Sequence, residues 1–166
     1  MNVFPEEILA LARKIITEFT ARGLMVSTAE SCTAGLIVAA LTEISGSSAV
    51  VDRGLVTYTN TAKKEMLGVQ EETLERFGAV SRETALQMAH GALFRSHADF
   101  AVAVTGIAGP GGGSAEKPVG LVHLAAKSKA GTLIHREMRY GNIGRDKVRL
   151  ATVMTALEML VELAQV

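Results

Sequence analysis

The sequence predicts an α/β fold: a three-layer α/β/α sandwich with a mixed, mainly parallel sheet and a C-terminal hairpin and helix. The first observation is composition, because 48% of the 166 residues are apolar, only 4% are aromatic, and glycine occurs 16 times without any tryptophan. This composition is typical of short βα turns rather than of an aromatic-rich β-sandwich. The second observation is that helical and strand-like segments alternate along the chain. Since a domain has about 150 residues, we interpret residues 1–166 as one domain.

The predicted elements follow from apolar periodicity and from the residues that begin or end helices. Pro5 and Gly23 bound the first helix, Ser81 is suited to cap a later one, and Gly131 indicates a hairpin turn. Helices are expected at 5–22, 36–44, from 62 to 67, 71–77, 84–94 and 147–164. Strands are expected at 24–29, 49–58, 101–104, 119–127 and 132–140.

Charge and cysteine content exclude several classes of protein. Lysine plus arginine equals aspartate plus glutamate at 17 each, so the formal net charge is zero and a general nucleic-acid or anionic-membrane surface is disfavoured. Cys32 is the only cysteine, which excludes an internal disulfide and a thiolate zinc cluster. No apolar run approaches the roughly 18 residues of a membrane span, and the N-terminus does not resemble a signal peptide. We expect a cytoplasmic homo-oligomer without nucleic-acid or membrane partners.

Three polar turns follow predicted strands, at 29–35, 56–63 and 105–113. In α/β folds such turns meet at the carboxyl ends of the strands, where backbone N–H groups stabilise anions and oxyanions. The glycine-rich third turn lacks the P-loop pattern, and its G-x-x-G-x-G spacing does not match the dinucleotide fingerprint. It remains suited to hold a carbonyl oxygen on which charge develops.

The first two turns carry the candidate catalytic residues, each with an ordinary structural alternative. Ser31 fits a nucleophile, although a serine there is more often a helix cap. Tyr58 and Lys63 are more often a packed ring and a solvated charge. No histidine lies beside a polar turn with a carboxylate, so a lysine is the economical base for a serine. Cys32 is better interpreted as a small buried hydrophobe than as a second nucleophile.

Eight ordered motifs together resemble the CinA C-terminal domain family, over about residues 5 to 164. They are Thr28–Thr33, Gly46–Ser48, Val56–Tyr58, Lys63, Leu67–Val69, Gly78–Ser81, Val104–Gly112 and Glu116–Gly120. Stand-alone members of this family have the activity of nicotinamide-nucleotide amidase. The resemblance therefore implies hydrolysis of the carboxamide of nicotinamide mononucleotide to nicotinate mononucleotide and ammonia, without metal or organic cofactor.

The resemblance also implies roles for individual residues. Ser31 matches the nucleophile, Lys63 its base, and Tyr58 a hydroxyl that assists proton transfer. For the nucleotide substrate, Glu30 would suit the cationic pyridinium and Arg145 the phosphate. The full expected substrate-binding set is Glu30, Thr33, Gly35, Asn60, Thr105, Gly106, Ala108, Gly109 and Arg145.

Two features depart from the family pattern, and two alternative functions stay open. Ala34-Gly35 replaces the common Gly-Gly, a change that we expect a helix interior to accept. The late arginine stands in Gly144-Arg145-Asp146 rather than in a Gly-Asp-Arg-like triplet, which leaves its role less defined. The alternatives are a nucleotide-binding or regulatory module without turnover, and an amidase for a related pyridine amide.

Overall fold

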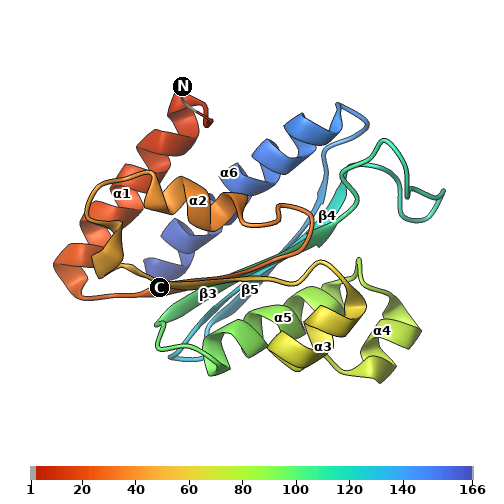
Figure 1. The fold of residues 1–166 in the computed structure, drawn as a ribbon, viewed down its shortest axis with the longest axis horizontal. Coiled ribbons are helices and arrows are strands. Elements are labelled where there is room, and N and C mark those ends of the chain that lie inside the picture. Colours follow the sequence, from red (N-terminus) through yellow and green to blue (C-terminus); the bar gives the residue numbers. More distant parts are fainter. Residues whose placement is uncertain (1–2, 166) are drawn as a thin grey trace.

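A computed structural model describes residues 3–165, which form a five-stranded sheet with helices on both faces (Figure 1). The strand order is β2-β1-β3-β4-β5. The strands are β1 (Val26–Glu30), β2 (Val51–Val56), β3 (Phe100–Gly106), β4 (Leu121–Ser128) and β5 (Leu133–Arg139). Strands β2, β1 and β3 are parallel, whereas β4 is antiparallel to both β3 and β5. Four strands thus share one direction, which confirms the mixed, mainly parallel sheet.

The helices divide into two layers, as the sequence predicts. One face of the sheet carries α1 (Glu6–Arg22), α2 (Leu36–Thr42) and α6 (Arg145–Ala164). The other face carries α3 (Asn60–Leu67), α4 (Glu71–Phe77) and α5 (Arg82–Phe94), so the three-layer sandwich is confirmed (Figure 1). A short 3₁₀ helix spans Ser47–Ala49. None of the helices within residues 3–165 is long and apolar enough to cross a membrane.

The two faces of the sheet pack by different means. The α1/α6 face buries large aliphatic and aromatic side chains, with Phe19 and Phe100 in a tilted ring contact at 5.4 Å. The α5 face is built on alanines such as Ala101 and Ala103, which let the helix approach the strands closely. Gly91 of α5 leaves no room for a Cβ, since that atom would fall on the carbonyl of Leu67 in α3. This close packing fixes α3, which carries Lys63, against α5.

Local signals in the sequence place most element ends within a few residues. Gly23 ends α1 with a φ of 66°, and the Ser81 hydroxyl accepts a hydrogen bond from the N–H of Thr84 at 3.2 Å, so both predicted caps are confirmed. Helix α6 begins two residues earlier than predicted, at Arg145. Ala34 was assigned to the wrong element: it lies in the turn before α2, not in a helix interior, with a φ of 47°. The expectation that a helix interior accepts its methyl group was therefore wrong.

Candidate active site

The three polar turns meet at one edge of the sheet because β2, β1 and β3 are adjacent and parallel. Ser31 follows β1 in the middle, Thr57 and Tyr58 follow β2 on one side, and Thr105 and Gly106 end β3 on the other. The backbone binds the turns together, since Ser31 N donates to Val104 O at 3.1 Å and Thr57 N donates to Glu30 O at 2.9 Å. The predicted convergence of the turns is thus present.

Lys63 and Ser31 are in direct contact although 32 residues separate them. Lys63 Nζ lies 3.0 Å from Ser31 Oγ, 3.0 Å from Thr57 O and 3.1 Å from Tyr58 O. The lysine is 1% exposed and the serine 8%. Thr59 Oγ1 accepts from Ala62 N at 3.0 Å and so caps α3, which directs the Lys63 side chain towards the serine. Lys63 is therefore not the solvated surface charge that its position alone suggested.

The surroundings of Lys63 favour a neutral amine. Burial lowers its pKa from the ordinary lysine value of 10.5. Among residues 3–165 no carboxylate pairs with it to oppose this shift. A neutral amine has two N–H donors and one lone pair, and two of the three contacts of Lys63 are carbonyl oxygens that can only accept. The third contact is Ser31 Oγ, so the amine and the serine hydroxyl lie within hydrogen-bond distance of each other.

The alternatives for Ser31 and Cys32 can now be decided. Helix α2 begins at Leu36 after Gly35 and has no side-chain cap, so the interpretation of Ser31 as a helix cap is wrong. Cys32 is buried, and burial raises the pKa of its thiol to about 11. A thiol that keeps its proton at neutral pH is a poor nucleophile. The interpretation of Cys32 as a small buried hydrophobe is confirmed.

Glu30 and Thr33, both expected to contact the substrate, are instead engaged inside the fold. The Glu30 carboxylate is fully buried, and Thr33 is equally inaccessible. The carboxylate accepts four hydrogen bonds: Thr33 Oγ1 at 2.7 Å, Ile37 N at 2.8 Å, Thr28 Oγ1 at 2.9 Å and Val38 N at 3.0 Å. Two of these donors are backbone N–H groups in the first turn of α2, where a negative charge is stabilising. Glu30 thus braces the Ser31 turn and has no free face for a pyridinium ring.

Arg149 of α6 is a residue of the site that sequence reasoning missed. Its Nε donates to Cys32 O at 3.0 Å and its Nη2 to Thr33 O at 3.1 Å. The guanidinium therefore ties the turn to α6. Its position one helical turn after Arg145 was the only available signal, because that spacing places the two arginines on one face of α6.

Tyr58 and Arg145 lie together at the rim. Arg145 Nη2 donates to the Tyr58 hydroxyl at 3.0 Å, and Arg145 Nη1 donates to Gly109 O at 2.9 Å. Tyr58 is 57% exposed, so its ring is not a packing element of the core. One arginine thereby joins the turn after β2 to the glycine-rich turn after β3.

These residues surround a cavity of about 190 Å³. Thr105, Gly106, Ala108 and Arg145 from the expected substrate-binding set line it, and the Thr105 hydroxyl donates to Ala79 O at 2.8 Å. Besides Glu30 and Thr33, three further expected residues do not line it. Gly35 ends the turn as the residue before α2, Gly109 contributes only its carbonyl to Arg145, and Asn60 lines a different cavity with Lys64 and Glu71. The full lining is Ser31, Cys32, Tyr58, Lys63, Ala79, Val80, Thr105, Gly106, Ala108 and Arg145.

Comparison with known proteins gives the family. The model of the CinA C-terminal domain matches residues 8–164. The chain belongs to the CinA C-terminal domain family. It is similar to "Nicotinamide-nucleotide amidohydrolase PncC" of Enterobacter agglomerans, 49% identical over 148 residues that cover 89% of this chain and 90% of that protein. The relative of the same name in Escherichia coli strain K12 is 47% identical, with 93% of each chain covered.

Members of the family differ in length and share the fold closely. A "CinA-like protein" of Geotalea daltonii is 47% identical over 96% of this chain, which spans only 38% of that longer protein. The crystal structure of a competence/damage inducible protein from Agrobacterium tumefaciens superposes with a TM-score of 0.98 at 74% identity, covering 99% of both chains. A CinA superfamily protein from Escherichia coli superposes with a TM-score of 0.89 at 34% identity, over 98% of this chain and 94% of that one.

Proposed function

We propose that this protein is a nicotinamide-nucleotide amidohydrolase that cleaves the carboxamide of nicotinamide mononucleotide by acyl transfer through Ser31. The substrate class is supported by the names of the relatives from Enterobacter agglomerans and Escherichia coli, which this chain matches over at least nine tenths of their length. The observation that carries the chemistry is the 3.0 Å contact between Lys63 Nζ and Ser31 Oγ, with the other two lysine contacts made to carbonyl oxygens. A serine beside a desolvated lysine is an activated nucleophile without need of a histidine.

In the first half of the proposed reaction, the neutral Lys63 amine accepts the Ser31 hydroxyl proton as Oγ bonds to the amide carbon. The carbonyl oxygen becomes an oxyanion, which backbone N–H groups of the turns after β1 and β3 would stabilise. The Lys63 ammonium then returns its proton to the amide nitrogen, the carbon–nitrogen bond breaks and ammonia leaves. Tyr58, whose backbone carbonyl contacts Lys63, would support this transfer through its rim hydroxyl.

In the second half, water hydrolyses the ester formed on Ser31. Lys63 accepts a proton from the water as the water oxygen bonds to the acyl carbon. The Lys63 ammonium then protonates Ser31 Oγ as the ester bond breaks. Nicotinate mononucleotide leaves and both residues return to their starting states. Every proton is thus moved by one amine, which requires that Lys63 gain and lose a proton easily near neutral pH.

The size and charge of the cavity suit one end of the substrate. A space of about 190 Å³ admits the pyridine ring and its carboxamide, so the ribose phosphate would extend to the rim. Arg145 lies at that rim with two of its donors on Tyr58 and Gly109. A guanidinium has five N–H donors, so the remaining ones can bind the phosphate.

The test is ammonia release from nicotinamide mononucleotide by the purified chain and by Ser31→Ala. We expect turnover by the wild type and a loss of at least about a thousandfold in Ser31→Ala, because the covalent nucleophile is removed. Cys32→Ala, the matched control in the same turn, retains substantial turnover. Ser31→Ala activity within tenfold of wild type would contradict the covalent scheme. Binding of the nucleotide without ammonia release by the wild type would instead indicate a binding module.

A further inference from the structure

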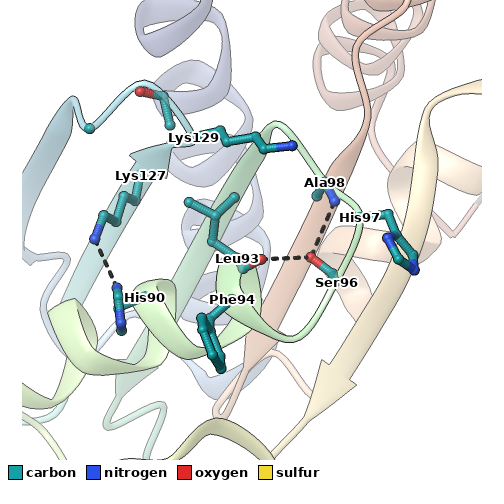
Figure 2. A pocket seen from close by; sticks show the side chains of 10 residues that line it. His90, Leu93, Phe94, Ser96, His97, Ala98, Lys127 and Lys129 are labelled. Atoms are coloured by element: carbon teal, nitrogen blue, oxygen red, sulfur yellow. Dashed lines mark hydrogen bonds between the residues drawn. The ribbon is translucent and has the colours of Figure 1, made fainter.

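Figure 2 shows a second cavity, of about 480 Å³. It lies at the opposite end of the sheet from Ser31. It is bounded by the end of α5, the segment that leads into β3, and the turn between β4 and β5. Phe100 and Ser128 pair at this end of β3 and β4, whereas Gly106 pairs with Val122 at the catalytic end. With a rise of about 3.3 Å per residue, the six steps along β3 separate the two cavities by roughly 20 Å. The second cavity therefore cannot hold the reacting amide.

The lining of this cavity is basic. Lys127, Lys129, His90 and His97 all contribute to it, and no carboxylate does. Within residues 3–165 neither lysine forms an ion pair with an aspartate or glutamate. Uncompensated cations around one hollow attract an anion, most of all in a chain whose net charge is zero.

The two nearby carboxylates are already occupied elsewhere. Asp52 Oδ2 accepts from Arg53 Nε at 2.7 Å and from the backbone N–H of His97 at 3.1 Å. Asp99 Oδ2 accepts from the backbone N–H of Met25 at 2.9 Å. These contacts fix the loop before β3 and leave the cavity without an internal counter-ion.

Lys127 and His90 are arranged as a pair of donors. Lys127 Nζ lies 2.8 Å from His90 Nδ1, and Figure 2 shows this contact between β4 and α5. A lysine ammonium can only donate, so His90 accepts at Nδ1 and carries its own proton on Nε2. Lys127 retains two further N–H donors and His90 one. Such a pair can donate several charge-assisted hydrogen bonds to one phosphate group. Lys129 lies on the other side of Leu93, with its side chain directed away from Lys127 (Figure 2).

Phe94 adds a flat apolar face beside the cations. Its side chain is 80% exposed, the most open of the large hydrophobic residues described. The ring lies nearly parallel to that of His90, at 18° and 6.3 Å between centroids. Leu93 and Ala98 make the neighbouring wall apolar. An exposed aromatic ring next to phosphate donors is suited to stack on a planar base.

We propose that this cavity binds a nucleoside monophosphate, with the phosphate on Lys127 and His90 and the base against Phe94. The site is independent of Ser31 and of the function proposed above, since none of its residues lines the catalytic cavity. Its ligand is recognised by two features together: an anionic phosphate and a ring of aromatic character. Inorganic phosphate offers only the first and a nucleoside only the second.

The experiment is calorimetric titration of the whole chain with adenosine monophosphate, inorganic phosphate and adenosine. Wild type, Lys127→Gln, Lys129→Gln and Phe94→Ala are compared with Lys14→Gln, an exposed lysine of α1 that matches the charge change away from the cavity. The thermal midpoint of each variant checks that it is folded. Since none of Lys127, Lys129 and Phe94 belongs to the buried hydrophobic core, we expect all variants to fold.

We expect saturable binding of adenosine monophosphate that Lys127→Gln weakens about tenfold, as loss of a charge-assisted contact does. Lys129→Gln should weaken it less, because it removes a more distant charge. Lys14→Gln should bind like wild type, and Phe94→Ala should weaken the nucleotide but not inorganic phosphate. Equal binding by Lys127→Gln and Lys14→Gln would overturn the site, since any nucleotide would then be bound elsewhere. Inorganic phosphate as tight as the nucleotide, with no effect of Phe94→Ala, would overturn the assignment to a nucleotide.

Discussion

Glu30 and Lys63 are two buried ionisable side chains at the same edge of the sheet, and their surroundings are opposite. Glu30 is enclosed by four donors, two hydroxyls and two backbone N–H groups of α2. Lys63 is surrounded by three oxygens, of which two are carbonyls and none is a carboxylate. Burial alone therefore does not decide what a charged residue does; the number and charge of its partners decide it.

The difference separates a structural support from the proposed base. A carboxylate that accepts four hydrogen bonds is held in position, so Glu30 serves the shape of the Ser31 turn. A lysine that loses its hydration without gaining a negative partner has a lowered pKa. Such an amine loses its proton more easily than an ordinary lysine does. One polar edge thus contains both a rigid support and the lysine that we propose as the base.

The largest expected effect comes from Lys63→Met, which keeps the bulk of the side chain and removes the amine. We expect turnover of nicotinamide mononucleotide to fall at least about a thousandfold, because loss of a general base removes up to about four orders of magnitude. Lys64→Met, next along α3 but paired with exposed Glu71, is the matched control and should stay active. A fully active Lys63→Met protein would break the comparison, since another group would then be the base.

The pH dependence of the wild type and of Lys63→Met tests the charge state of the Lys63 amine. Because the folded pKa of Lys63 is below its unfolded value of 10.5, the unfolded chain binds more protons between the two values. The free energy of unfolding should therefore rise with pH across that window, and kcat/KM should rise to a plateau below pH 10.5 as the amine becomes neutral. Urea unfolding at several pH values measures the first. Lys63→Met should lose this contribution and be more stable than wild type at neutral pH.

The second effect in size concerns the brace. Glu30→Gln replaces an acceptor of four hydrogen bonds by an amide whose nitrogen faces donors, so we expect the free energy of unfolding to fall by about 3 kcal/mol. Urea unfolding of the purified chain gives this value. Glu7→Gln, an exposed carboxylate in the first turn of α1, should change it by less than about 0.5 kcal/mol. Equal effects at the two positions would show that Glu30 is not the support described here.

Arg149 sharpens the comparison, because it is a cation that acts through geometry and not through proton transfer. Arg149→Met removes both hydrogen bonds to the carbonyls of Cys32 and Thr33. We expect kcat to fall about 10- to 100-fold with little change in KM, since small misplacements of a nucleophile cost rates of this order. The pH at which kcat/KM reaches half of its plateau should not move. A shift of that pH would mean that Arg149 tunes the lysine instead.

The sequence predicted the fold and singled out Ser31 and Lys63, which the structure brings into contact, for identifiable physical reasons. Apolar periodicity, Gly23 and Ser81 are local signals, and each determines an element end without tertiary information. Ser31 and Lys63 lie in turns after strands, and adjacent parallel strands must bring such turns to one edge. The absence of a suitably placed histidine then indicated a lysine base before any distance was known.

What the sequence could not predict depends on side-chain direction. Glu30 is the last residue of β1, and whether its carboxylate points to substrate or into the fold depends on where α2 begins. Asn60 comes shortly after β2, as Tyr58 does, but it is the first residue of α3 and lines another cavity. Arg149 contacts a turn 116 residues away, a pairing that no local pattern contains.

The smallest expected effect tests how firmly the Glu30 hydrogen bonds hold the turn after β1. Ala34 has a φ of 47°, a left-handed conformation that costs an L-residue about 1–2 kcal/mol relative to glycine. Ala34→Gly removes that cost but adds about 0.4–1 kcal/mol of unfolded-chain entropy, so we expect a net gain of about 0.5–1 kcal/mol in the free energy of unfolding.

Ala10→Gly, at an exposed position of α1, is the matched control for Ala34→Gly. It should lose about 1 kcal/mol, because glycine is unfavourable in a helix interior. Urea unfolding of the two variants side by side measures the opposite signs. A loss of stability in Ala34→Gly would mean that the methyl group at position 34 contributes packing that outweighs its backbone strain. A gain would show that the Glu30 hydrogen bonds hold the turn against the preference of its own backbone.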